Sequence, residues 1–80
     1  MNIKDAIVAR FKKLCEQEGI KLNELATRAG IAPSTVYSMM DNRRRDLSVL
    51  TVKKLCDGLE ISVTDFFDDR IFKNLEQEIK

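Results

Sequence analysis

The sequence contains no histidine, two cysteines, three glycines and one proline among its 80 residues. Without histidine, and with only two thiols, a structural zinc site is not expected. The chain also lacks a glycine-rich phosphate loop and any serine or cysteine with a base nearby. We therefore predict that the protein is not an enzyme and that it has no catalytic residues, no metal site and no cofactor.

Long hydrophobic runs are also missing. No stretch of 18 apolar residues is present, so a membrane-spanning segment is not expected. The first ten residues, MNIKDAIVAR, include an acidic residue and lack the apolar core of a secretion signal, so we expect a cytoplasmic protein. Cys15 and Cys56 fall among apolar residues at helical spacing, and a reducing compartment favours two buried thiols over a disulfide.

What the sequence does contain is enough for one small domain. An apolar content of 44% is ordinary for a globular chain and argues against disorder. The charge is uneven along the chain although the net value is only +1. Residues 1–56 hold 11 Lys and Arg against 6 Asp and Glu, whereas residues 57–80 hold 3 against 7.

The most informative stretch is residues 22–41, LNELATRAGIAPSTVYSMMD. Its apolar residues predict two short helices, because they recur at intervals of three and four. Gly30 is suited to end the first helix, and Pro33 is suited to the first position of the second. The apolar positions are, in the first helix, Leu22, Leu25, Ala26 and Ala29, and in the second, Val36, Met39 and Met40.

Three of these residues indicate a helix-turn-helix. Ala26 is small enough for the helices to approach closely, Gly30 permits the tight turn, and Val36 can fill the space between them. An ordinary helical hairpin in a small bundle is the alternative, which the pattern does not exclude.

Three further helices are predicted around this motif. The first spans about residues 3–18 and ends at Gly19; Arg10 is expected on its polar side, opposite the apolar stripe. Ser48 is a suitable N-cap for a helix whose core face is Val49, Val52, Leu55, Cys56 and Leu59. Ser62 opens a short helix through residue 67. Between these helices, residues 41–46 (DNRRRD) are expected to form a loop, which we call the arginine loop.

The last residues, 68–80, are expected to add a further short helix. Asp68 and Asp69 are suited to its N-terminus, because negative charge there is favourable. An apolar stripe would follow at Ile71, Phe72, Leu75 and Ile79. The stripe either completes the core or packs against a second copy of the chain.

This pattern resembles the Cro/C1-type (XRE-like) helix-turn-helix family of bacterial and phage DNA-binding proteins. The resemblance covers roughly residues 8–67. It implies an all-α, compact five-helix lambda-repressor-like domain at residues 1–67, with the motif at 22–41. The helical extension expected at 68–80 lies beyond the part of the chain that the resemblance covers. The residues that carry the resemblance are Leu25, Ala26, Gly30, Ile31, Ser34, Thr35, Val36, Leu55, Leu59, Ile61, Ser62 and Phe66.

The chain departs from the family pattern at four places. A polar cap and a phosphate-contacting glutamine usually open the second helix, where this chain has Lys21 and Leu22. An ion pair usually joins the first and third helices, where this chain has Cys15 and Met40. Replacing both members of a buried pair by apolar residues is often neutral or stabilising, so we predict that these two side chains lie in or near contact. Glycines common in the family are replaced by Asn42 and Glu60.

The resemblance implies a DNA-binding transcriptional regulator, expected to be a repressor, whose third helix enters the major groove. We expect the base-facing residues to be Pro33, Ser34, Thr35, Tyr37 and Ser38. The expected contacts to the DNA backbone are Lys21, Arg28, Asn42, Arg43, Arg44 and Arg45. The recognition helix has no Arg, Asn or Gln for a bidentate base contact, so modest specificity is predicted for each half-site.

Two further expectations concern partners. One copy offers a small surface, so a homodimer is expected on double-stranded DNA. Phe72, Leu75 and Ile79 are its candidate contact, unless this stripe completes the core instead. The alternative function is a protein-interaction module of the same fold, such as an antitoxin or a co-regulator. The uneven charge fits a basic DNA-binding face, but it also fits a domain without a nucleic-acid partner.

Overall fold

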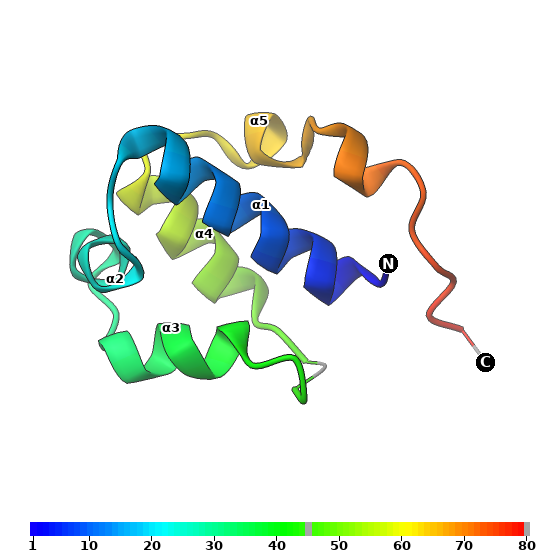
Figure 1. Cartoon of the computed structure of the whole chain (residues 1–80), viewed down its shortest axis with the longest axis horizontal. Helices are drawn as coiled ribbons and strands as arrows, with labels where there is room; N and C mark the ends of the chain where they lie inside the picture. The colour runs from blue at the N-terminus through cyan, green and yellow to red at the C-terminus, as the bar shows by residue number, and fades with distance from the viewer. Residues whose placement is uncertain (45, 80) are drawn as a thin grey trace.

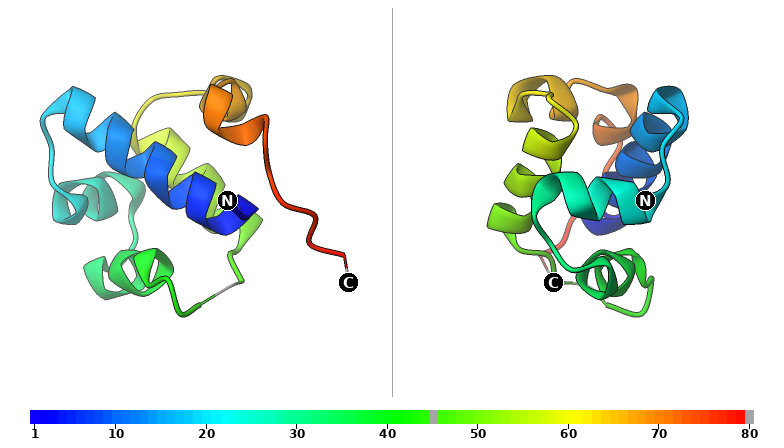
Figure 2. Two further views of the ribbon diagram at one scale, coloured as in Figure 1. Left: turned by 45° about the vertical axis from the view of Figure 1, so that its right-hand side comes forward. Right: turned by 90° about the vertical axis from the view of Figure 1, so that its left-hand side faces the viewer.

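The computed structural model describes residues 1–44 and 46–79, and within them it contains helices and no strand (Figure 1). The helix α3 lies on one side of the molecule, and α5 and η1 lie on the opposite side (Figures 1 and 2). The predicted all-α architecture is confirmed. The elements are α1 (Ile3–Glu18), α2 (Leu22–Ala29), α3 (Pro33–Met40), α4 (Val49–Gly58), α5 (Val63–Phe67) and one turn of 3-10 helix, η1 (Arg70–Phe72).

The helix ends follow from local sequence. The side chains of Ser48 and Ser62 accept hydrogen bonds from the amides of Thr51 and Asp65, at 3.4 and 3.0 Å, as predicted for N-caps. Asn2 caps α1 in the same way, and sequence analysis had not assigned it that role. The predicted stops at Gly19 and Gly30 are confirmed.

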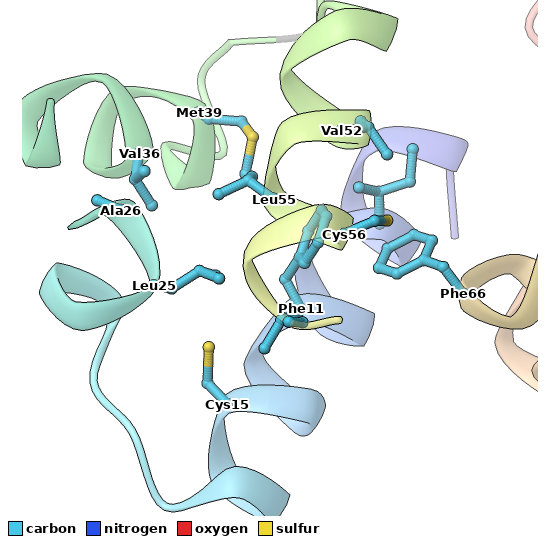
Figure 3. Close-up of a cluster of buried hydrophobic side chains, with 12 residues drawn as sticks. Phe11, Cys15, Leu25, Ala26, Val36, Met39, Val52, Leu55, Cys56 and Phe66 are labelled. Carbon is cyan, nitrogen blue, oxygen red and sulfur yellow. The ribbon is translucent and has the colours of Figure 1, made fainter. Parts of the chain in front are cut away.

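The close crossing of α2 and α3 depends on Gly30, Ala26 and Val36. Gly30 takes a left-handed backbone with φ of 69°, which lets the amide of Ile31 donate to the carbonyl of Ala26 at 2.9 Å. Ala26 and Val36 are fully buried, and Figure 3 shows them next to each other. The predicted helix-turn-helix is therefore present, and it presents the opposite side of α3 to solvent.

The core joins all five helices around two aromatic rings. Phe11 of α1 and Phe66 of α5 lie with their ring centroids 4.4 Å apart (Figure 3). Cys15 and Cys56 are buried free thiols, as expected, and burial raises the pKa of both. Met40 packs against the same core as Cys15, but direct contact between these two stays a prediction.

Two side chains differ from the predicted pattern. Val49 is 84% exposed, because it is the first residue of α4 and lies at the rim of a surface hollow instead of under another helix. Arg10 is not a solvated side chain. Its Nε donates to the carbonyl of Phe66 at 2.8 Å, and its guanidinium pairs with Asp69 at 3.3 Å. Arg10 therefore ties the segment after α5 to α1.

The helix predicted for residues 68–80 is limited to the single turn η1, which Asp69 caps at the amide of Ile71. The chain then continues without helix through residue 79, so the apolar stripe does not form. Phe72 turns inward, with its ring centroid 4.9 Å from that of Phe67. Leu75 is half-buried and Ile79 is exposed. So short a helix is not stable by itself, and packing of Phe72 on the core decides the local conformation.

The structure at the end of α4 explains why residue 58 is glycine and shows the consequence of having Glu60 where the family usually has glycine. A Cβ atom added to Gly58 would lie 3.0 Å from the backbone nitrogen of Ala29, so only glycine allows α2 and α4 to approach this closely. Two residues later, Glu60 takes a left-handed backbone with φ of 56°. This is the position where the resemblance implied glycine, and the strain of a side chain there costs stability.

We expect Glu60→Gly to stabilise the domain by ~0.5–1 kcal/mol, because release of backbone strain exceeds the added flexibility of the unfolded chain. In a domain of this size the melting temperature should rise by about 2–6 °C. Thermal unfolding of Glu60→Gln, which removes the charge and keeps the strain, is the control. A lower melting temperature for the glycine variant would contradict the assignment.

Candidate nucleic-acid interface

The outer face of α3 is polar and accessible. Pro33, Ser34 and Thr35 are exposed in its first turn, and Tyr37 is 53% exposed in the second. Val36 and Met39 occupy the buried side of the same helix. The structure thus places four of the five predicted base-facing residues in solvent, which is the arrangement that a helix entering a groove requires.

The fifth residue, Ser38, is half-buried. It lines a shallow hollow of about 150 Å³ between α3, the arginine loop and the start of α4. Thr35 and Arg44 line the same hollow, so α3 and the loop form one continuous surface there. Ser38 therefore lies where α3 meets the loop, and Tyr37 is the more accessible of the two.

The arginine loop follows α3 directly. Asn42, Arg43 and Arg44 are exposed, and Arg45 lies outside the described residues. The guanidinium of Arg43 pairs with the carboxylate of Asp41 at 2.8 Å. The loop therefore adds positive charge to the surface of α3, but part of that charge is balanced by Asp41.

The remaining two predicted backbone contacts lie on α2 and have different surroundings. Lys21 is exposed at the N-cap of α2 and makes no side-chain capping bond, so its side chain does not occupy the amide groups at this helix end. Arg28 pairs with Glu24 at 2.7 Å and shares a hollow with Asp57 and Glu60. These acidic neighbours favour Lys21 over Arg28 as a phosphate contact.

Lys4 belongs to this region, and sequence reasoning did not single it out. The residue is only 3% exposed, and its Nζ donates to the carbonyl of Asp41 at the end of α3. The last turn of α3 contains no basic residue, so the ammonium group of Lys4 faces the negative end of that helix. A lysine at an apolar, buried position of α1 was the available indication, but its partner is 37 positions away.

An apolar hollow of about 380 Å³ lies elsewhere, between α1, α4 and α5. Val49, Val63 and Phe67 line it and are partly or largely exposed, and Leu50, the residue after Val49, is 62% exposed. The apolar stripe predicted to form the dimer is not an exposed apolar surface of this kind. Phe72 packs inward, and Ile79 is the exposed residue of the stripe. The stripe of Phe72, Leu75 and Ile79 is therefore not a single surface.

Metal sites and membrane-spanning helices have specific structural requirements. Within residues 1–44 and 46–79, no group of three or more His, Cys, Asp or Glu side chains is placed to hold a metal ion. In the same residues, no helix has the length and hydropathy needed to cross a bilayer.

A tight crossing at a left-handed glycine, with a polar second helix beside a basic loop, defines the class of helix-turn-helix domains that bind DNA. The sequence comparisons are more specific. The model of the Cro/C1-type HTH DNA-binding domain matches residues 10–70, and the chain belongs to that family. The expected family is thereby confirmed.

A solved structure supports the same assignment. The chain is similar to the crystal structure of the prophage Lp1 protein 11, with a TM-score of 0.81 and 32% sequence identity. The similarity covers 94% of this chain and 100% of that one. Comparison with curated protein sequences gives no match. The protein is therefore a DNA-binding regulator domain of the Cro/C1 type.

Proposed function

We propose that this protein is a transcriptional repressor that recognises a specific DNA site in the bacterial cytoplasm, with α3 in the major groove. The observation that carries the proposal is the exposed polar face of α3, continuous with the arginine loop. Pro33, Ser34, Thr35, Tyr37 and Ser38 would face the bases. Occupation of the site would then block transcription.

Contacts to the DNA backbone would hold α3 in the groove. Lys21 and the amides at the start of α2 would bind one phosphate, and Asn42 and the arginine loop would bind others. Arg28 remains in the proposed set of phosphate contacts, but we expect it to contribute least, because it pairs with Glu24. Such contacts position the protein without distinguishing sequences.

We expect Tyr37→Ala to change the preferred DNA sequence, because Tyr37 has the largest exposed side chain on α3. Loss of an apolar contact to a thymine methyl group, worth ~1 kcal/mol or more, should weaken binding to the best site at least about fivefold. Selection from a randomised duplex pool, compared between wild type and variant, measures the preference. Tyr37→Phe is the matched control that keeps the ring.

The same selection tests the groove assignment. Affinity for random duplex should stay within about twofold for Tyr37→Ala, since base contacts contribute little to non-specific binding. An unchanged sequence preference in the selected pool would remove Tyr37 from the DNA-reading surface.

Two copies would bind one operator, because a single short recognition helix offers few base contacts. Sedimentation of the protein with a selected duplex should show two chains per duplex. With Phe72 packed inward, Leu75 and Ile79 are what remains of the proposed contact in the tail. One chain per duplex would contradict the dimer.

The second candidate function is a protein-interaction module, such as an antitoxin or co-regulator. The apolar hollow lined by Val49, Val63 and Phe67 favours it, because exposed apolar surface often marks a binding site for another protein. Binding of random duplex at low salt separates the two functions. A DNA-binding regulator retains the duplex under these conditions, whereas an interaction module does not.

A further inference from the structure

Asp41 organises the chain where it leaves α3. Its carboxylate accepts hydrogen bonds from three donors of Arg43: from the backbone amide at 2.9 Å, from Nε at 3.1 and 3.3 Å to the two oxygens, and from Nη2 at 2.8 Å. The side-chain bonds form a bidentate pair, which is the strong geometry for a guanidinium and a carboxylate. The position of the Arg43 side chain is therefore set by the residue that ends the recognition helix.

Asp41 is itself fixed to the body of the domain. Its carbonyl accepts a hydrogen bond from the Nζ of Lys4 in α1 and another from the amide of Arg44 at 3.1 Å. Lys4 is buried, so this connection is held on the inner side of the loop. The end of α3 and the start of the arginine loop are thus anchored together before any ligand binds.

The charges of this arrangement nearly cancel. Hydrogen bonds from the Arg43 side chain are the main reason that the pKa of Asp41 is lowered from 3.8 to about 2, and the carboxylate is ionised at neutral pH. The Arg43 side chain is 86% exposed and its partner 27% exposed. A DNA phosphate approaching Arg43 therefore also meets a negative charge.

We propose that Asp41 limits the sequence-independent attraction of this domain to DNA, by pairing with Arg43 and removing that arginine from the set of phosphate contacts. The inference rests on the proposed function and refines it. Arg44, exposed and without a carboxylate partner among the described residues, then carries more of the phosphate binding than Arg43 does.

The test is the affinity for a random-sequence duplex, measured at several salt concentrations. Asp41→Asn keeps a side-chain oxygen for the Arg43 amide but removes the charge. It should raise affinity by about fivefold to tenfold at about 0.1 M salt and steepen the log–log salt slope by ~0.9, one phosphate contact. Asp68→Asn is the matched control, because it changes the net charge equally after α5, on the opposite side from α3.

A double-substitution cycle separates this role from one in which Asp41 does not influence Arg43, whereas the comparison with Asp68→Asn controls for net charge. Arg43→Gln leaves Asp41 unbalanced and should weaken binding several-fold. The pair Asp41→Asn and Arg43→Gln together should restore the wild-type affinity. If Arg43 instead contacts phosphate directly and Asp41 is a bystander, the double variant will match Arg43→Gln.

The measurements distinguish failure of this inference from failure of the proposed function. Failure of the wild-type protein to bind random duplex at low salt would overturn the proposed function and this inference with it. Wild-type binding that Asp41→Asn leaves unchanged, or changes no more than Asp68→Asn does, would overturn this inference alone. Thermal unfolding of each variant checks that the domain remains folded, and Arg43→Gln provides the comparison if Asp41→Asn is unstable.

Discussion

Ala26→Leu should destabilise the domain strongly. Ala26 is fully buried where α2 crosses α3, next to Val36, so three added carbon atoms have no space unless the helices separate. Overpacking of this kind costs ~1–3 kcal/mol, a large share of the ~5–15 kcal/mol that stabilises a typical domain. The melting temperature should fall by roughly 5–20 °C.

The measurement is thermal and urea unfolding beside a control on the same helix. Thr27→Leu introduces the same side chain one position later, where the residue is exposed, and should change stability by no more than about 0.5 kcal/mol. The difference in stability between the two variants gives the cost of overpacking the α2–α3 crossing, apart from the effect of leucine on the helix itself. Full wild-type stability of Ala26→Leu would refute the close crossing on which the orientation of α3 depends.

Removal of the arginine loop's cations should weaken DNA binding on every sequence. In the variant Arg43→Ala/Arg44→Ala/Arg45→Ala, affinity should fall roughly 10- to 100-fold at about 0.1 M salt, because each phosphate contact contributes ~0.9 to the salt slope. We expect the slope to flatten by about two and not three. Arg43 is already paired with Asp41, so its loss removes no direct phosphate contact and weakens binding only through the uncovered charge of Asp41.

A second triple variant controls for net charge. Lys12→Ala/Arg70→Ala/Lys73→Ala removes three exposed cations from α1 and from the segment at η1, which lies on the side opposite α3. Its salt slope should stay close to that of the wild type. Equal slopes for the wild type and the arginine-loop variant would show that the loop does not contact phosphate.

Local physics explains what sequence analysis predicted correctly. Ser48, Ser62 and Gly30 act through hydrogen bonds and backbone angles within a few residues, so their neighbours in sequence suffice to place them. The crossing at Ala26 was predictable for the same reason, since its spacing from Gly30 is fixed by one helical turn.

The errors share a different origin. The tail was predicted as helix from the spacing of Phe72 and Leu75, but aromatic packing of Phe72 on Phe67 decided its conformation. The link between Lys4 and Asp41 joins residues 37 positions apart, which no local pattern reveals. In each case a contact formed by the folded chain outweighed the local preference.

The surroundings of the predicted cations were equally hidden. Sequence analysis treated Arg28 and Arg43 alike, as basic residues near the motif. In the structure Arg28 pairs with Glu24 and Arg43 pairs with Asp41. A count of basic residues therefore overstates the positive charge that these two guanidinium groups offer to phosphate. Net charge by itself therefore does not rank phosphate contacts.

The reactivity of the two buried thiols can be used to measure transient unfolding of this domain. Cys15 and Cys56 are covered by other side chains, and burial raises the pKa of each, so a thiolate is rarely formed while the helices remain together. An alkylating reagent reaches them only when part of the structure transiently unfolds. The rate of modification of the natural protein, without any introduced label, thus gives the frequency of these excursions and shows whether bound DNA suppresses them.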